Sequence, residues 1–218
     1  MIKTILLNSD LHGPAARMSD YLTPQVDALR RFTLTTPIEE PVLGRAVKVP
    51  DGVVECGWFD DVDAMLQAFA CRNLADLARP GAAQLWAATE NVVVPGPQDP
   101  FPPSGVKLTA FVKRAGQYSP EAFQRYWRVE HAPLVPKTPR LRRYVQSHLL
   151  LEQYGRGEPI CDGTAELWWD TVEDYRASWA SEEVQVEQSN DAAKFIGSGP
   201  FIFVGKETLV RDSPTSTP

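Results

Sequence analysis

The stretch YWRVEHAPLV, residues 126–135, places a histidine where a side chain could move protons. His131 follows Tyr126 and Trp127 by about one helical turn and stands two residues before Pro133, which ends a helix. Imidazole titrates near neutral pH, so in a dry pocket lined by aromatic rings it can act as a general acid or base. A histidine at a helix C-terminus can instead serve the structure, because it complements the helix dipole and donates to free carbonyl groups. Both roles are open from these residues alone.

Three polar side chains alternate along the strand predicted over residues 141–151. Tyr144, Gln146 and His148 share one face of that strand, because successive side chains point to opposite faces. Such a row is either the solvent-facing surface of an edge strand or the wall of a polar pocket inside a barrel. In the second case Tyr144 and His148 join the predicted catalytic set, and Gln146 helps to orient a phenol or a carboxylate.

Four aromatic residues are further candidates for substrate binding. Tyr126 and Trp127 lie at helical spacing from Phe123, so at least one of them belongs to the core by default. Trp168 and Trp169 point to opposite faces of their strand. One of these two tryptophans is therefore expected to line the interior of the fold.

The charge balance argues against electrostatic binding of nucleic acid. The chain carries 28 acidic and 22 basic residues, a formal net charge of -6, with no run of lysine or arginine. With 43% hydrophobic residues, a chain of 218 residues can bury a sizeable core. The first residues, MIKTILLNSD, contain an apolar run too short for a signal peptide or a membrane span. We expect a cytoplasmic protein with no nucleic-acid or membrane partner.

The cysteines and the absence of familiar motifs narrow the chemistry further. Cys56, Cys71 and Cys161 are widely spaced and odd in number, so neither a disulfide framework nor a structural zinc site is predicted. The sequence has no phosphate-binding glycine loop, no H-E-x-x-H and no G-x-S-x-G. We therefore expect no metal and no cofactor, and an enzyme of this sequence would work with its own side chains.

A proline-rich segment separates the sequence into two halves, and several short stretches of the first half recur in the second. Residues 95–105, PGPQDPFPPSG, suit neither a helix nor a sheet interior and are predicted to be a linker. Three stretches recur in the same order in the two halves: Leu29-Arg30-Arg31-Phe32 and Leu141-Arg142-Arg143-Tyr144, Trp58–Val62 and Trp168–Val172, Thr89–Val92 and Lys206–Leu209. We predict a first repeat over residues 1–94, a second over residues 106–211 and a disordered tail over residues 212–218.

Each half predicts the element order β-α-β-β-α-β of a ferredoxin-like domain. The helix that begins at Pro120 has an N-cap serine, Ser119, and proline at its first position. The predicted elements of the second half are residues 106–114, 120–131, 141–151, 165–169, 172–179 and 201–210. Those of the first half are residues 3–8, 15–22, 28–35, 53–59, 62–70 and 84–94. A four-stranded sheet with helices on one face leaves its other face bare, so two such sheets in one chain can cover each other.

Four motifs of the second half occur together. A helix carries F-x-x-Y-W-x-x-x-H-A-P-L from Phe123 to Leu134, and a strand follows that begins with Arg143 and Tyr144. A D-G-x-A-E-L-W-W strand and a terminal F-x-x-x-E-T-x-V strand come next. This combination, over residues 106–210, resembles the EthD-like branch of the dimeric α/β-barrel superfamily.

The resemblance implies that two ferredoxin-like sheets pair into a barrel, here from two halves of one chain, with a pocket between sheet and helices. Relatives include decarboxylases, dehydratases, cyclases, isomerases and cofactor-free oxygenases that act on aromatic or polyketide-like molecules, and others bind haem. The first half departs from the pattern, because the repeat places Ser19 at the position of His131 and Ala15 at that of Trp127. One functional site per chain is therefore expected.

We predict an α+β protein of two tandem ferredoxin-like repeats, packed as a pseudo-dimeric α/β barrel. The predicted function is that of a cofactor-independent lyase on a small aromatic or polyketide-like substrate, with His131 as general acid and base. Glu130 is expected to be solvated, although beside a catalytic imidazole it could hold one tautomer. Two alternatives stay open: a cofactor-free monooxygenase, and a non-catalytic binder of haem or another hydrophobic ligand. The expected assembly is a homodimer or a pseudo-dimeric monomer.

Overall fold

The computed structural model describes residues 1–8, 18, 28–39, 47–48, 52–71, 84–96 and 105–212. Several predicted features lie outside the described residues: most of the helix over residues 15–22, with Ala15 and Ser19, residues 97–104 of the linker and residues 213–218 of the tail. Among the described helices, none combines the length and the apolar character that crossing a membrane requires.

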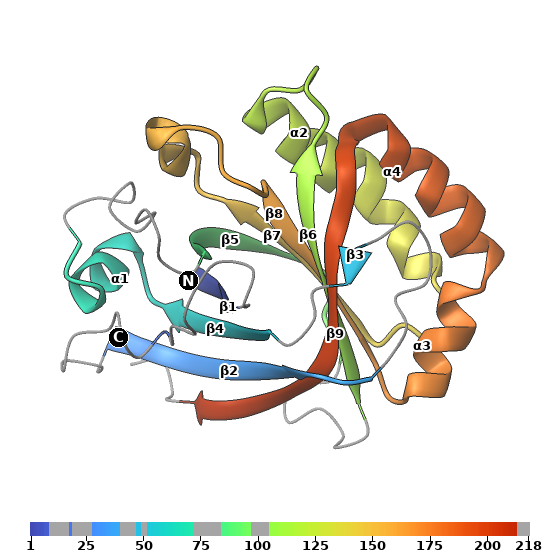
Figure 1. Ribbon diagram of the computed structural model, residues 1–218, viewed down its shortest axis with the longest axis horizontal. Coiled ribbons are helices and arrows are strands. Elements are labelled where there is room, and N and C mark those ends of the chain that lie inside the picture. The colour runs from blue at the N-terminus through green and yellow to red at the C-terminus, as the bar shows by residue number, and fades with distance from the viewer. Residues whose placement is uncertain are drawn as a thin grey trace.

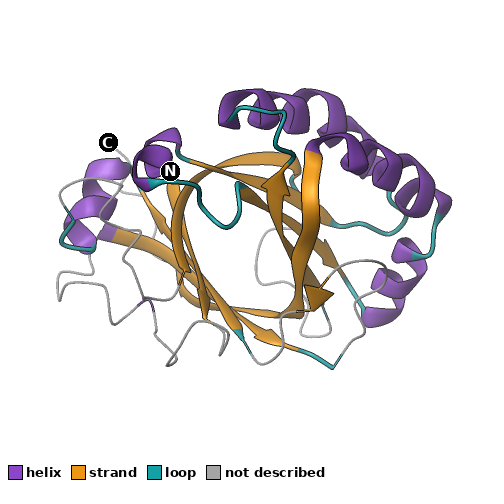
Figure 2. Cartoon of the chain, turned by 45° about the horizontal axis from the view of Figure 1, so that its top comes forward, coloured by secondary structure: helices purple, strands orange, loops and turns teal. Residues whose placement is uncertain are grey.

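Nine strands of the described chain form one sheet, and eight of them close into a barrel (Figure 1). The strands of the first half are β1 (Ile2–Asn8), β2 (Leu29–Pro37), β3 (Val47–Lys48), β4 (Val53–Phe59) and β5 (Gln84–Val94). Those of the second half are β6 (Val106–Arg114), β7 (Arg143–Leu149), β8 (Gly163–Trp169) and β9 (Ile196–Asp212). The order is β2-β4-β1-β5-β7-β8-β6-β9-β3, and a further pairing of β2 with β9 closes the ring seen in Figure 2.

The long strands of the two halves follow one pairing order. In the first half the order is β2-β4-β1-β5, and in the second half it is β7-β8-β6-β9. Strand β5 pairs with β7 and strand β9 pairs with β2, all antiparallel. Each half therefore meets the other along two seams, and the large antiparallel sheet confirms the predicted α+β class.

Helices lie outside the barrel (Figure 1). Helix α1 (Val62–Ala68) packs on the first half, and α2 (Pro120–Tyr126), α3 (Val172–Trp179) and α4 (Ser189–Phe195) pack on the second half. Helix α2 begins as predicted, with the Ser119 hydroxyl accepting a hydrogen bond from the Ala122 N–H (3.2 Å). It continues into a π-helical turn, Trp127–His131, and a second such turn, Glu183–Gln188, precedes α4.

Side-chain alternation separates a helix-facing layer from the barrel interior. On β6, Val106, Leu108 and Val112 pack against the helices, whereas Lys107 and Phe111 point into the barrel. Both faces of this strand are covered, so seven consecutive residues from its start are buried. The helix-facing layer and the barrel interior are therefore distinct compartments, each with its own polar groups.

The barrel interior combines an apolar cluster with a buried ionic network. Glu166 pairs with Lys3 and with Lys107 (2.7 Å), Lys107 pairs with Glu207 (2.7 Å), and Lys3 pairs with Glu90 (3.1 Å). Burial disfavours the charged form of Glu166, but the two ammonium groups hold the pKa of its carboxyl well below the usual range. The network is therefore ionised at neutral pH and joins the first half of the chain to the second.

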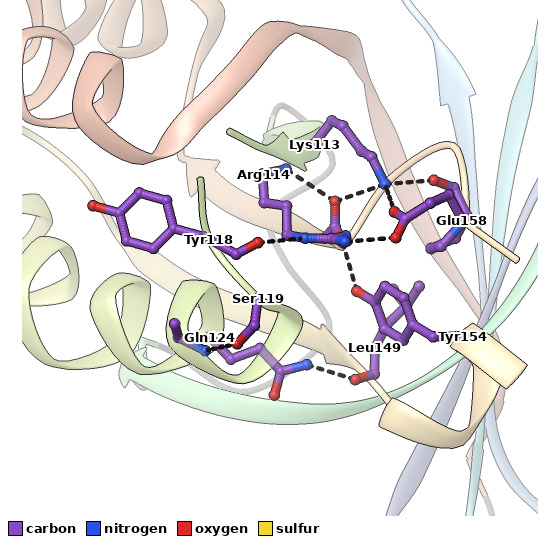
Figure 3. A network of polar contacts seen from close by, with 11 residues as sticks. Lys113, Arg114, Tyr118, Ser119, Gln124, Leu149, Tyr154 and Glu158 are labelled. Atoms are coloured by element: carbon purple, nitrogen blue, oxygen red, sulfur yellow. Dashed lines mark hydrogen bonds and ion pairs between the residues drawn. The ribbon is translucent and has the colours of Figure 1, made fainter. Parts of the chain in front are cut away.

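The segment between β7 and β8 is anchored at one end of the barrel by the polar network in Figure 3. Asp162 accepts hydrogen bonds from the Arg114 backbone N–H (2.9 Å), the Arg114 guanidinium and the Tyr154 hydroxyl (2.6 Å). Glu158 pairs with Arg114 (2.6 Å) and with Lys113 (2.9 Å). Because the Tyr154 ring packs on the interior apolar cluster, these contacts hold the segment against the barrel core.

The predicted strands are confirmed to within a few residues in both halves, but helical segments were missed, among them the 3-10 helices Ala132–Lys137 and Leu151–Arg156. Residues 183–195 form the second π-helical turn and α4, and β9 begins at Ile196 rather than at residue 201. The run IGSGP at the start of β9 contains glycine and proline, which favour a loop. It pairs with β6 through two register shifts, and such bulges accommodate these residues.

We expect Glu166→Gln to lower the free energy of unfolding by about 3–5 kcal/mol, because it leaves two buried ammonium groups with one counter-charge fewer. Urea unfolding followed by tryptophan fluorescence measures this loss. The control is Glu187→Gln, which removes an exposed pair with Lys137 (2.9 Å) and should cost less than about 1 kcal/mol. Equal losses in the two variants would contradict a buried ionised network.

Candidate functional site

An apolar cavity of about 150 Å³ lies between the helices and the outer face of β6, β7, β8 and β9. Its aliphatic and aromatic walls are formed by Leu108, Ala110, Val112, Trp127, Val135, Ala165, Leu167, Trp179, Val184, Ala192, Ile196 and Ile202. Four polar side chains reach it: His131, Tyr144, Gln188 and Ser189. An apolar hollow with a few convergent polar groups is typical of small-molecule sites. In the part of the chain that the structure describes, no group of three or more His, Cys, Asp or Glu side chains is placed to hold a metal ion.

His131 ends the first π-helical turn and is held by a carboxylate from α4. Its Nδ1 lies 2.9 Å from Oδ2 of Asp191. The other carboxylate oxygen, Oδ1, accepts hydrogen bonds from the Tyr126 hydroxyl and from Lys194 Nζ, both at 2.9 Å. His131 and Asp191 are only 8% and 7% exposed, so this pair is shielded from solvent. π-Helical turns of this kind occur frequently at functional sites.

The protonation states of the pair follow from burial and hydrogen bonding. Burial lowers the pKa of His131, and the hydrogen bond and charge of Asp191 oppose that shift. Burial acts against the charge of Asp191, but hydrogen bonds from Lys194, His131 and Tyr126 hold the pKa of its carboxyl below the usual value. At neutral pH Asp191 is therefore a carboxylate beside a neutral imidazole. Since a carboxylate only accepts, Nδ1 carries the proton and Nε2 keeps its lone pair.

Tyr144 lines the same cavity. Its oxygen accepts hydrogen bonds from Trp127 Nε1 (3.3 Å) and from Gln146 Nε2 (3.0 Å). Burial raises the pKa of Tyr144 to about 12, although both hydrogen bonds act to lower it. Tyr144 is thus a neutral phenol at physiological pH and can donate a hydrogen bond to a ligand.

Five residues predicted for the site do not line the cavity: Tyr126, Gln146, His148, Trp168 and Trp169. Tyr126 and Gln146 instead support residues that do, through Asp191 and Tyr144. The face of β7 that carries Tyr144 and Gln146 is turned towards the helices, so the expected polar wall inside the barrel is corrected to a wall beneath the helices.

The two tryptophans of β8 point to opposite faces, as alternation requires. Trp168 faces the barrel interior, where its Nε1 donates to Glu207 Oε2 (3.0 Å) and its ring lies under Lys107. Trp169 packs against the ring of Tyr175 in the helical layer, with 5.3 Å between ring centroids. Neither tryptophan lines this cavity, and their role in substrate binding stays a prediction.

His148 is buried behind the wall of the cavity. Its ring lies 4.8 Å from that of Trp127, and its Nε2 faces Oε1 of Gln146 at 3.2 Å. Burial, assisted by the nearby charge of Arg128, lowers the pKa of His148 to about 3. His148 is therefore a neutral hydrogen-bond donor to Gln146 and lies outside the cavity lining, unlike the catalytic position expected from the sequence.

Gly163, in the D-G-x-A-E-L-W-W strand, leaves room for the side chain of Trp127, which begins the π-helical turn after α2. A Cβ atom at this glycine would lie 2.8 Å from Trp127 Cζ3 and 2.4 Å from the Ser147 carbonyl oxygen. Only glycine therefore lets the indole lie directly on β8. The resulting position of Trp127 forms one wall of the cavity and brings its Nε1 to Tyr144.

Sequence reasoning missed Asp191, the partner of His131. The two residues are 60 positions apart, and Asp191 lies on a helix that was not predicted. The segment over residues 183–195 has no proline or glycine and contains apolar residues at Val184, Ala192 and Phe195, a signal that could have indicated a helix. Nothing in the sequence indicates which side of that helix meets His131. Glu130, the acid considered for this role, is exposed.

Residues 116–199 match the family model described as the EthD domain. These residues of the second half are similar to an EthD domain. His131, Tyr144 and Asp191 all lie within the matched residues. No curated protein matches the chain.

Solved structures share the fold of the whole chain at low sequence identity. An anthrone oxidase-like protein has a TM-score of 0.57 and 10% identity, with 100% of this chain and 96% of that chain covered. A protein of Lactobacillus acidophilus NCFM, provisionally described as a monooxygenase, has a TM-score of 0.51 and 11% identity, with 100% and 98% covered. An EthD family protein of Bacillus halodurans C-125 is 26% identical, with a TM-score of 0.40, and covers 48% of this chain and 99% of its own. The two full-length matches show a fold of the dimeric α/β-barrel type.

We expect Asp191→Asn to lower the pKa of His131 further, because the carboxylate is the group that raises it. Since the folded pKa of His131 is depressed, this residue contributes stability above its unfolded pKa of 6.5 and loses it as the pH falls through the folded value. In Asp191→Asn, the pH at which His131 stops contributing to folding stability should therefore be lower than in wild type. An NMR titration of the imidazole nitrogens measures the shift.

The matched control for that titration is Asp170→Asn, which removes a half-exposed pair with Arg142 (3.2 Å) that does not line the cavity. It should leave the His131 titration unchanged. A His131 pKa that rises or stays constant in Asp191→Asn would contradict the assigned pair.

Proposed function

We propose that this EthD-domain protein is a cofactor-independent lyase that acts on a small aromatic or polyketide-like substrate. The observation that carries the proposal is one apolar cavity lined both by His131, a neutral imidazole held by Asp191, and by the neutral phenol of Tyr144. A base and a hydrogen-bond donor in a dry cavity are the groups that enolate chemistry requires. The reaction is elimination of water, carbon dioxide or a small aldehyde driven by proton transfer.

A dehydration illustrates the roles of these side chains. Nε2 of His131 takes a proton from the carbon next to a substrate carbonyl, and the Tyr144 hydroxyl donates to the carbonyl oxygen as negative charge develops there. The electron pair then forms the carbon–carbon double bond while the hydroxyl group leaves. The imidazolium returns its proton to the departing hydroxide, so water is released and His131 is neutral again. Asp191 holds Nδ1–H and stabilises the transient imidazolium.

The size of the cavity supports a substrate with one ring. An apolar cavity of about 150 Å³ in another protein holds a benzene-sized ligand. Apolar walls bind such a ring by excluding water, and Gln188 and Ser189 offer polar contacts to its substituents. A phenolic acid or a hydroxy ketone of one ring fits these walls best.

We also propose that residues 1–94 and 106–211 are two tandem ferredoxin-like repeats, joined by the linker over residues 95–105. The equal strand order of the halves supports this. Three pairs of interior contacts recur at equivalent positions: Lys3 over Trp58 and Lys107 over Trp168, Arg31 over Trp58 and Arg143 over Trp168, Lys3 with Glu90 and Lys107 with Glu207. The protein is then a pseudo-dimeric monomer with one functional site. Asp212, expected at the start of the tail, is instead the last residue of β9 and pairs with Arg31. The free thiols of its three cysteines suit a cytoplasmic location.

A cofactor-free monooxygenase is the second candidate. Structures with the same fold are described as an anthrone oxidase-like protein and, provisionally, as a monooxygenase. The same base can deprotonate an electron-rich phenol, and the phenolate then reacts with dioxygen as co-substrate. One oxygen atom becomes the second carbonyl oxygen of a quinone and the other leaves as water, so the substrate itself supplies the electrons. The dry cavity beside Trp127 would shield that intermediate from water.

We expect His131→Ala to reduce turnover of the responsive member of a panel of one-ring phenolic acids and hydroxy ketones by about 10²–10⁴-fold, the usual contribution of a general acid or base. Glu130→Gln changes the exposed neighbour in the same turn and should leave the rate within a factor of about two, as expected for a surface substitution. Circular dichroism verifies that both variants are folded. Unchanged turnover in folded His131→Ala removes the proposal, and dependence of the rate on oxygen in anaerobic buffer selects the monooxygenase over the lyase.

A further inference from the structure

Gln146 is a buried amide at the seam between the two halves of the chain. It is 0% exposed, and Asn91 of β5, its direct cross-strand partner, donates from Nδ2 to its Oε1 at 2.9 Å. The same oxygen faces His148 Nε2 at 3.2 Å. On the other side, its Nε2 donates to the Trp127 carbonyl and to the Tyr144 hydroxyl, both at 3.0 Å. Every polar atom of this side chain therefore has a partner.

Two groups of Trp127 fix the direction of every hydrogen bond in this network. Its backbone carbonyl can only accept, so the side of Gln146 that faces it must be the NH₂ group. Its indole N–H can only donate, so the Tyr144 oxygen must accept from it. These constraints hold regardless of how the amide or the imidazole is oriented.

These fixed directions determine which hydrogen bonds the Tyr144 hydroxyl can still make. Its oxygen has two lone pairs, and both are occupied, one by the indole N–H and one by the Gln146 amide. Its own proton has no acceptor among the described residues, and the side chain lines the cavity. Tyr144 can thus donate to a bound ligand but cannot accept from it.

We propose that Gln146 and Asn91 are positioning residues that make Tyr144 a hydrogen-bond donor towards the cavity, so that the site selects ligands with a carbonyl or phenolate oxygen. The inference rests on the proposed function, in which Tyr144 binds the substrate oxygen. It also gives the first half a part in the site of the second, because Asn91 belongs to β5. A ligand that offers only a donor at this position leaves the Tyr144 proton without a partner, which costs affinity.

The test compares two probes of similar shape, benzaldehyde and styrene, of which only the first has an acceptor oxygen. Calorimetric titration of wild type should give a preference for benzaldehyde of about tenfold, the value of one hydrogen bond to a buried group. Tyr144→Phe should abolish that preference. In wild type the carbonyl stretching band of bound benzaldehyde should move to lower wavenumber, and in Tyr144→Phe it should not.

Gln146→Glu tests the positioning role directly. The introduced carboxyl, ionised or protonated towards the Trp127 carbonyl, offers Tyr144 an acceptor and draws its proton away from the cavity. The preference for benzaldehyde and the shift of its carbonyl band should therefore both be lost. Gln146→Met, which has a similar shape and no acceptor of comparable strength, should keep both.

Asn91→Asp is the second variant, for the case in which Gln146→Glu fails to fold. Its half-buried carboxylate cannot donate to Oε1 and binds the NH₂ group of Gln146 more strongly than the neutral Trp127 carbonyl does, so the amide turns and its oxygen faces Tyr144. The preference for benzaldehyde should again fall.

A preference retained in a folded Gln146→Glu or Asn91→Asp protein overturns the inference. Wild type that binds both probes equally, or binds neither, also overturns it. Unchanged turnover in His131→Ala together with a preserved preference would remove the proposed function alone.

Discussion

Glu166 binds Lys3 of the first half and Lys107 of the second inside the barrel, and the rest of the structure is arranged around this contact. Three charges without access to water are tolerable only when each is paired, so the strands that carry them must keep one register. That register fixes which face of β6 and β8 looks inward. The opposite face, which carries the cavity, is determined by the same contact because side chains alternate.

The helix-facing side of the second half is apolar for a different reason. Aromatic rings from α2 and α4, with Phe123, Trp127 and Phe195 in one cluster, cover the outer face of β6 and leave a hollow where Ala110 and Ala165 are small. In such surroundings imidazole loses its charge readily, and a neighbouring carboxylate keeps its proton on one nitrogen. Burial and one hydrogen bond therefore leave this histidine neutral, with its proton on Nδ1 and a lone pair on Nε2.

The two halves share one strand order but contribute unequally to the candidate site. Their strands follow the same order, and their interior lysines and tryptophans make equivalent contacts. The second half alone supplies His131, Asp191 and Tyr144, but the first half closes the barrel and holds Gln146 through Asn91. The candidate site therefore depends on both halves even though the side chains that line its cavity come from one.

The sequence by itself determined the strands, the start of α2 at Ser119 and the EthD motif with its histidine, because these depend on period, capping and local spacing. The tertiary structure decided that Asp191, not Glu130, holds His131, that His148 lies behind the cavity wall, and that the Tyr144 oxygen accepts hydrogen bonds from Trp127 and Gln146. Alternation assigns a residue to one of two faces, but only packing determines what covers each face. The contacts that give these side chains their protonation and direction join segments 17 to 60 residues apart, and no local pattern encodes such distances.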